Sequence, residues 1–146
     1  QLAQLVKANL KPGINCYLEY SNEVWNGTFT QCKANFALAK AEVAAGENTL
    51  NDGGRETNQW YWAWRRVGKR TLEIANTFER VMGDDPRIRP VLAGQLVNPR
   101  VIQEGLTYIE RYAGPPREHL FAIAAAPYFG HDKTVSETAV SVAAAV

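Results

Sequence analysis

The sequence predicts an α/β fold built from parallel βαβ units in a single domain. Three stretches have the character of strands, at residues 14–20, 88–93 and 119–126, and helical patterns separate them. Strands that alternate with helices form parallel sheets, because each helical crossover returns the chain to the end of the sheet where the previous strand began. The 146 residues suit one domain and can bury a core without a metal or a disulfide framework. We therefore treat residues 1–146 as one domain.

Each strand is predicted from its own pattern. In residues 14–20 the side chains alternate, with one face carrying Ile14, Cys16, Leu18 and Tyr20. Residues 88–93 have the composition of a short strand that is buried on both faces. Residues 119–126 form a third apolar run, and its small alanines also suit the crowded interior of a barrel. An open sheet and a barrel both fit these strands.

Helical periodicity predicts five helices. They cover residues 2–10, 28–46, 57–83, 98–114 and a segment that begins at 134. Thr28 with Gln31, and Thr134 with Glu137, have the spacing of capping boxes, in which side chains satisfy the free N–H groups at a helix start. Asn98 followed by Pro99 is also typical of a helix start.

Three tryptophans lie in the longest of these helices. Trp60 and Trp64 belong to an apolar stripe whose members are spaced by four and three residues, and Trp62 falls off it. Packing against a sheet or a neighbouring helix is the simpler interpretation of all three. A sugar-stacking role for Trp62 is the alternative.

Composition excludes several classes of function. The 16 basic and 15 acidic side chains nearly balance, so nothing indicates a nucleic acid or an anionic membrane as partner. No run reaches the roughly 18 apolar residues of a membrane-spanning helix. Cys16 and Cys32 lack a metal-binding spacing, so we expect two free, buried thiols, no metal and no cofactor. A glycosylation sequon begins at Asn26, but such short matches are common by chance.

Functional groups of parallel α/β folds collect at the carboxyl ends of the strands. This rule selects the segments that follow the three predicted strands, with the sequences SNEVWN, GQLVN and PYFGHD. We expect them to share one rim of the sheet. The first is part of EYSNEVWN, which contains two carboxylates, two aromatic rings and two amides within eight residues.

The string YLEYSNEVWN, followed by a helix that begins near Phe29, resembles the fourth strand of (β/α)8 glycoside hydrolases and of cellulase-like proteins. In that family the catalytic acid/base is the Glu of an Asn-Glu pair. More weakly, the resemblance extends over the whole chain, with a fifth strand ending at Gln95 and a sixth ending at Tyr128. It therefore implies a partial TIM barrel, covering about strands 4 to 6.

The resemblance also implies roles for individual residues. Glu23 would be the general acid/base, and Asn22 would bind the sugar hydroxyl beside the reacting carbon. Trp25 could stack on a sugar face, because pyranose C–H groups are apolar. Tyr128 matches a tyrosine that hydrogen-bonds the nucleophile, and the alternative is that it anchors the loop by packing.

Two further residues complete the predicted rim. Gln95 ends the second strand, and His131 lies close after the third, although a lone loop histidine is more often only solvated. The expected ligand is a polysaccharide or an oligosaccharide. A secreted or extracellular parent protein is implied, with any signal peptide outside this sequence.

One catalytic group is missing from the expected pattern. The family nucleophile is a Glu at the end of the seventh strand, beyond the last segment predicted here. Glu19 cannot replace it, because four strand residues span roughly 13 Å, whereas retention needs about 5 to 5.5 Å. We predict instead that Glu19 is an interior residue, paired with Arg87 or Arg89.

Two other accounts stay open. A partial barrel would leave sheet edges exposed, which predicts a homo-oligomer or another association through those edges. The chain could then be a non-catalytic carbohydrate-binding module or a self-associating α/β fragment. A small open-sheet protein with an unrelated ligand is a third account, and Gly53-Gly54 lacks the spacing of a nucleotide-binding loop.

Overall fold

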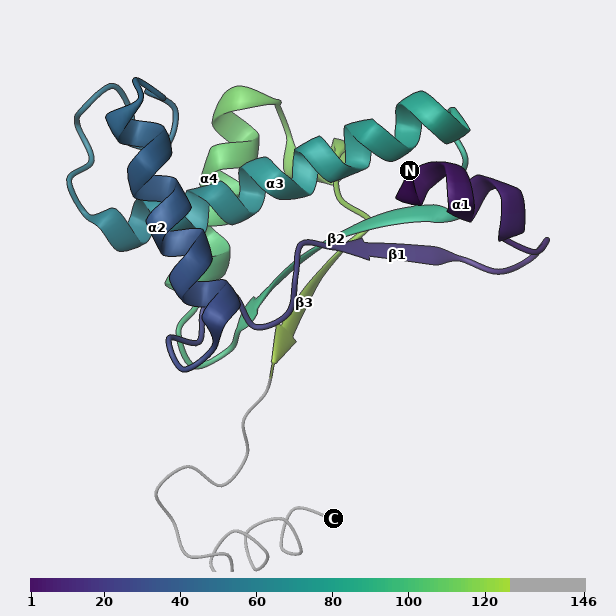
Figure 1. Cartoon of the computed structure of the whole chain (residues 1–146), viewed down its shortest axis with the longest axis horizontal. Coiled ribbons are helices and arrows are strands. Elements are labelled where there is room, and N and C mark those ends of the chain that lie inside the picture. The colour runs from purple at the N-terminus through teal and green to yellow at the C-terminus, as the bar shows by residue number, and fades with distance from the viewer. Residues whose placement is uncertain (127–146) are drawn as a thin grey trace, which may run out of the picture.

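The computed structural model describes residues 1–126 of the chain. Its elements are α1 (Leu2–Asn9), β1 (Cys16–Glu19), α2 (Thr30–Ala44), α3 (Gln59–Met82), β2 (Ile88–Gln95), α4 (Arg100–Tyr112), the 3-10 turn η1 (Pro116–Glu118) and β3 (Ala122–Ala126). The strands form one sheet in the order β1-β2-β3. Figure 1 shows α3 running over the strands, with α1 near one of its ends and α2 near the other.

All strand pairs in the described sheet are parallel. In β1 and β2, Cys16 pairs with Ile88 and Glu19 with Val91. In β2 and β3, Val91 pairs with Ala122, and the pairing continues to the end of both strands. The predicted parallel α/β arrangement is therefore confirmed, and the carboxyl ends of the strands lie at one edge of the sheet.

The centre of the core joins α3 and α4 to β2. Val67, Leu92 and Ile109 form one buried cluster, each almost fully excluded from solvent. The two helices approach closely, because a Cβ added to Gly68 would lie 2.5 Å from the carbonyl oxygen of Gly105. Glycine is therefore required at position 68 of α3.

Two smaller clusters extend this core toward the other helices. Ala3, Leu18 and Phe78 join α1, β1 and the C-terminal part of α3. At the other end of α3, Leu50 and Tyr108 pack with Ala39 and Ala63, so that α2 is held against the α3–α4 pair. Apolar burial of this kind is the main stabilising contribution to the fold.

The local predictions are only partly correct. The first strand is shorter than expected, and the capping box at Thr28 and Gln31 is wrong, because α2 has Phe29 as its N-cap and no side-chain cap. Gln31 donates instead to the carbonyl oxygen of Asn22. Both cysteines are free thiols, as predicted, although only Cys32 is fully buried. The helix predicted from residue 134 lies outside the described residues.

Candidate functional site

The segment after β1 leaves the strand in a sharp and strained turn. β1 ends at Glu19, and two non-glycine residues that follow it have positive φ, 62° at Ser21 and 46° at Glu23. Such backbone conformations cost about 1–3 kcal/mol each and persist where the surrounding structure fixes them. The turn therefore places Asn22 and Glu23 directly beyond the carboxyl end of a parallel strand.

The Glu23 side chain is partly buried and bound to Asn26. Asn26 Nδ2 donates to Glu23 Oε2 at 3.0 Å, and the backbone N–H of Asn26 donates to the Glu23 carbonyl oxygen, also at 3.0 Å. The acid/base candidate is therefore held by both a side chain and the main chain of the same residue.

The neighbours of Glu23 have different surroundings. Asn22 is exposed, so its side chain is accessible, while its carbonyl oxygen accepts from Gln31 Nε2 at 2.7 Å. Val24 is buried in the central core, and the partly buried ring of Trp25 packs against the same cluster. Trp25 can therefore offer only part of its surface to a ligand.

Gln95 lies at the same edge of the sheet, as predicted. It is the last residue of β2 and pairs with Ala126, the last residue of β3. A straight continuation of β1 would bring Glu23 level with Gln95, but the chain turns away at Ser21. No hydrogen bond joins the two side chains within the described residues. Tyr128 and His131 lie outside the described residues.

The prediction for Glu19 is wrong. Its side chain is exposed, although partial burial raises the pKa of the carboxyl. Arg87 pairs with Asp85 instead, at 2.6 Å, and Arg89 donates to the hydroxyl of Tyr17 at 3.0 Å. Both arginines are therefore engaged by partners other than Glu19, which the strand pattern could not show.

The contacts of Trp62 favour packing over the sugar-stacking hypothesis. Its indole Nε1 donates to the carbonyl oxygen of Glu56 at 2.9 Å, and its ring packs against the cluster around Leu50 and Tyr108. Trp60, which the helical stripe predicted to be buried, is 42% exposed and lies 4.4 Å from the ring of Phe36. The simpler interpretation, packing, therefore describes Trp62.

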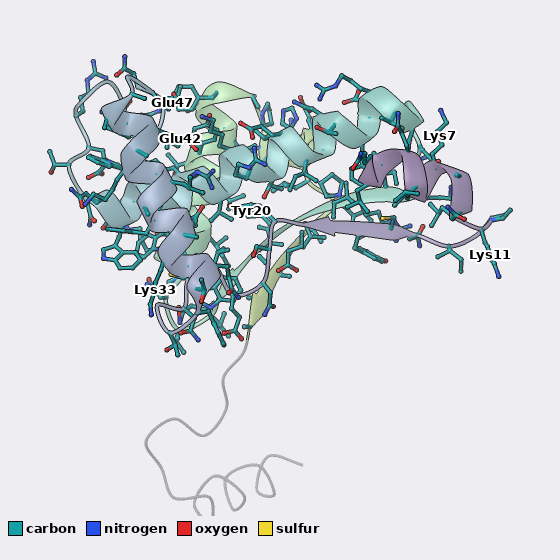
Figure 2. The ribbon with its side chains drawn as sticks, in the orientation of Figure 1. Lys7, Lys11, Tyr20, Lys33, Glu42 and Glu47 are labelled. Carbon is teal, nitrogen blue, oxygen red and sulfur yellow. The ribbon has the colours of Figure 1, made fainter. Side chains whose placement is uncertain are left out.

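An ionic network connects the carboxyl end of β1 to α2 and α3. Arg66 Nη1 donates to the hydroxyl of Tyr20 at 2.8 Å, and Arg66 Nε donates to Glu42 at 2.6 Å. Lys69 bridges Glu42 and Glu47, at 3.0 and 2.5 Å. Figure 2 shows Tyr20 where the chain leaves β1, and Glu42 and Glu47 toward the far end of α2.

These contacts determine how the two carboxylates ionise. Burial tends to raise the pKa of Glu42, but the hydrogen bonds from Arg66 and Lys69 outweigh it and lower the pKa. Hydrogen bonds from Lys69 and Thr49 lower the pKa of Glu47 to about 2. Both groups are therefore held as anions, which suits a structural role better than proton transfer near neutral pH.

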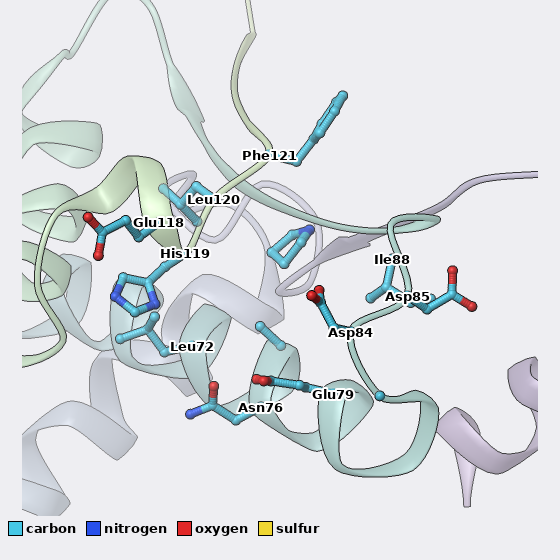
Figure 3. Close-up of a pocket in the computed structure, with 13 residues that line it drawn as sticks. Leu72, Asn76, Glu79, Asp84, Asp85, Ile88, Glu118, His119, Leu120 and Phe121 are labelled. Carbon is cyan, nitrogen blue, oxygen red and sulfur yellow. The ribbon is translucent and has the colours of Figure 1, made fainter.

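A cavity of about 320 Å³ lies at the opposite end of the sheet. Its lining includes Ile88, the first residue of β2, and Phe121, which directly precedes β3. Figure 3 shows the carboxylates of Glu79 and Asp84 on one side of it and the ring of His119 on the other. Of the predicted site residues that the structure describes, Asn22, Glu23, Trp25 and Gln95, none lines this cavity.

The described part of the chain shows two further absences. Within residues 1–126, no cluster of three or more metal-binding side chains is present. No helix in this range combines the length and the apolar character that crossing a membrane requires.

Comparison of the chain with protein-family models, curated proteins and solved structures finds no match. The site is therefore assessed from its own geometry. Sequence reasoning missed one member of it, Asn26, which it considered only as part of a sequon. Its spacing, three residues after Glu23 and two before Thr28, is the available signal, since asparagine in a turn commonly bonds nearby backbone groups.

Proposed function

We propose that the chain is a glycoside hydrolase-like domain that acts on a polysaccharide, with Glu23 as general acid/base. In this proposal the sheet corresponds to about strands 4 to 6 of a (β/α)8 barrel. One observation carries it: the Glu23 carboxylate is fixed in a strained turn directly beyond the carboxyl end of a parallel strand. Catalytic groups of barrel enzymes occupy this position.

The neighbouring residues support the same chemistry. The exposed amide of Asn22 is available to a sugar hydroxyl, and Gln95 lies at the same edge of the sheet. The partly exposed ring of Trp25 offers an apolar surface to a pyranose. Tyr128 and His131 remain proposed members of the site.

The proposed reaction needs two carboxyl groups. Glu23 would protonate the oxygen of the leaving sugar and, in a retaining mechanism, later take a proton from the water that hydrolyses the glycosyl-enzyme intermediate. A second carboxylate must lie opposite it, roughly 5 to 5.5 Å away for retention and farther for inversion. The family that the sequence resembles places this group at the end of the seventh strand.

The decisive experiment compares the wild-type chain with Glu23→Gln on cellulose, xylan, mannan and aryl glycosides. General acid catalysis contributes about 10²- to 10⁴-fold, so we expect at least a 100-fold loss of kcat/KM on the polysaccharides. The loss should be smaller on aryl glycosides whose leaving group needs little protonation. Glu19→Gln is the matched control, because Glu19 is an exposed carboxylate in β1 only four residues earlier.

Equal turnover by the wild type and Glu23→Gln would contradict the catalytic role. Sugar binding without any turnover would favour a non-catalytic carbohydrate-binding module.

A specific observation favours a second candidate, self-association. All four residues of β1 border a groove of about 800 Å³, which also contains Ala3, Val6, Ile74 and Phe78. β1 is an edge strand of the sheet formed by residues 1–126, and two large apolar side chains in or next to it are exposed, Ile14 by 55% and Tyr17 by 57%. Exposed edges of this kind pair readily with another strand.

Sedimentation analysis over a hundredfold range of concentration tests this candidate. A self-associating chain should gain mass as its concentration rises, and Ile14→Lys should prevent the gain. A monomer at every concentration would exclude it.

A further inference from the structure

Asn26 supplies the hydrogen bond that the Glu23 carboxylate receives within residues 1–126. The bond joins Asn26 Nδ2 to Glu23 Oε2 at 3.0 Å, and both side chains are partly buried. A partly buried bond to an ionised group is stronger than the same bond in open water. Asn26 is therefore well placed to control the orientation of this carboxylate.

The orientation of the Asn26 amide follows from its two partners. Its Oδ1 accepts from the backbone N–H of Thr28 at 3.1 Å, while its Nδ2 donates to Glu23. A flipped amide would direct its oxygen at a carboxylate and its NH2 group at an N–H donor. Both contacts would then be repulsive, so each partner selects the same orientation.

The main chain connects this pair to α2. The Asn26 N–H bonds the Glu23 carbonyl oxygen, and the Asn26 carbonyl oxygen accepts from Phe29 N, both at 3.0 Å. Phe29 is the N-cap of α2, so two successive turns link Glu23 to the start of a 15-residue helix. Asn26 is therefore anchored on both sides.

The arrangement leaves one oxygen of Glu23 available. In the described part of the chain, Oε2 is bonded to Asn26 and Oε1 has no hydrogen-bond partner. We propose that Asn26 is a positioning residue, which fixes the Glu23 carboxyl so that Oε1 faces the substrate and transfers the proton. The catalytic consequence rests on the proposed function, whereas the contact itself can be tested alone.

The contact is tested by NMR on the whole chain. We expect the side-chain amide signal of Asn26 to differ between the wild-type protein and Glu23→Gln, because the substitution replaces the carboxylate that accepts its N–H. Glu19→Gln should leave the signal unchanged. An Asn26 signal that is the same in both proteins at every pH would overturn the inference.

The consequence for catalysis is tested with two substitutions. Asn26→Ala removes both side-chain bonds, whereas Asn26→Asp keeps the acceptor for Thr28, removes the donor to Glu23 and places a second carboxylate beside it. We expect both variants to lower kcat about 10- to 100-fold with KM within about twofold. Wild-type kcat in Asn26→Asp would show that Asn26 only stabilises the turn, and would overturn the inference.

Asn9→Ala is the matched control, since Asn9 is an exposed asparagine that donates to the Leu5 carbonyl oxygen within α1. It should leave kcat unchanged. The outcomes separate the two proposals. If the wild type shows no turnover but its Asn26 amide signal changes on Glu23→Gln, only the proposed function is contradicted. If the Asn26 amide signal is unaffected by Glu23→Gln, the inference is contradicted at any level of turnover.

Discussion

Among the helices, charged side chains bind one another in a network, whereas at the end of β1 the described residues give Glu23 a single, neutral partner. Arg66 is 6% exposed and bonds three other side chains: Glu42, Asn35 and Tyr20. Glu23 accepts one side-chain bond within residues 1–126, from Asn26, in a turn with positive φ. Charges that are fully paired stabilise the fold, whereas a carboxylate with an unbonded acceptor oxygen can bind a ligand.

The largest expected effect is the loss of the buried arginine. Arg66→Met should lower the free energy of unfolding by about 2–3 kcal/mol, because it leaves the buried amide oxygen of Asn35 without its donor and removes one of the two cationic partners of Glu42. Urea denaturation followed by circular dichroism measures this change.

Arg70→Met is the matched control in the same helix. Its guanidinium lies over the same Tyr20 ring, 5.8 Å from the centroid, but the side chain is 38% exposed and pairs with the equally exposed Glu73. We expect a loss of at most about 1 kcal/mol. Equal losses in the free energy of unfolding for Arg66→Met and Arg70→Met would contradict a special contribution from the buried Arg66.

The second effect is a dependence of stability on acid pH. The pKa of Glu47 falls from an ordinary 4.5 to about 2 on folding, so its stabilising contribution is complete above pH 4.5 and is lost as the pH falls toward 2. The side chain is 27% exposed, so solvent screening reduces the contribution, which we place at about 1–2 kcal/mol.

Urea unfolding at pH 6, 4 and 3 measures this contribution. Glu47→Gln should be less stable than the wild type at pH 6, and the difference should shrink at pH 3. A constant difference across this range would contradict the assignment to Glu47.

The smallest effect concerns the strained turn. Ser21→Gly should raise the free energy of unfolding by about 0.5–1 kcal/mol, because glycine adopts the φ of 62° without steric cost. Thermal unfolding can resolve this. Asn22→Gly is the control, since Asn22 does not have positive φ and should gain nothing. Equal effects at both positions would mean that the turn is not strained.

Much of the fold could be predicted because its signals are local. The spacing of apolar residues along α3 and the alternation in β1 depend only on how each element repeats along the chain. The same is true of the position of Glu23, directly after a strand. The predicted helix start at Thr28 is wrong because Gln31 does not complete a local cap. It donates instead to the carbonyl oxygen of Asn22, nine residues earlier.

The partners of the charged and aromatic residues could not be predicted in the same way. Glu19 was expected to pair with Arg87 or Arg89, but Arg87 binds Asp85 and Arg89 binds Tyr17. Trp62 lies off the apolar stripe, and yet its side chain is held by a hydrogen bond to Glu56 and by packing against the cluster around Leu50 and Tyr108. These outcomes depend on which segments come together, and a single sequence does not contain that information in its periodicity.

The sequence by itself determined the parallel α/β class, the order of helices and strands through residue 126, and the placement of Asn22 and Glu23 beyond a strand end. Tertiary structure decided that Arg66 connects that strand end to α2, that α3 and α4 meet at Gly68, and that Asn26 turns back onto Glu23. The physical reason is the range of the interactions involved. Backbone periodicity acts over a few residues, whereas pairing and close packing depend on how the whole chain folds.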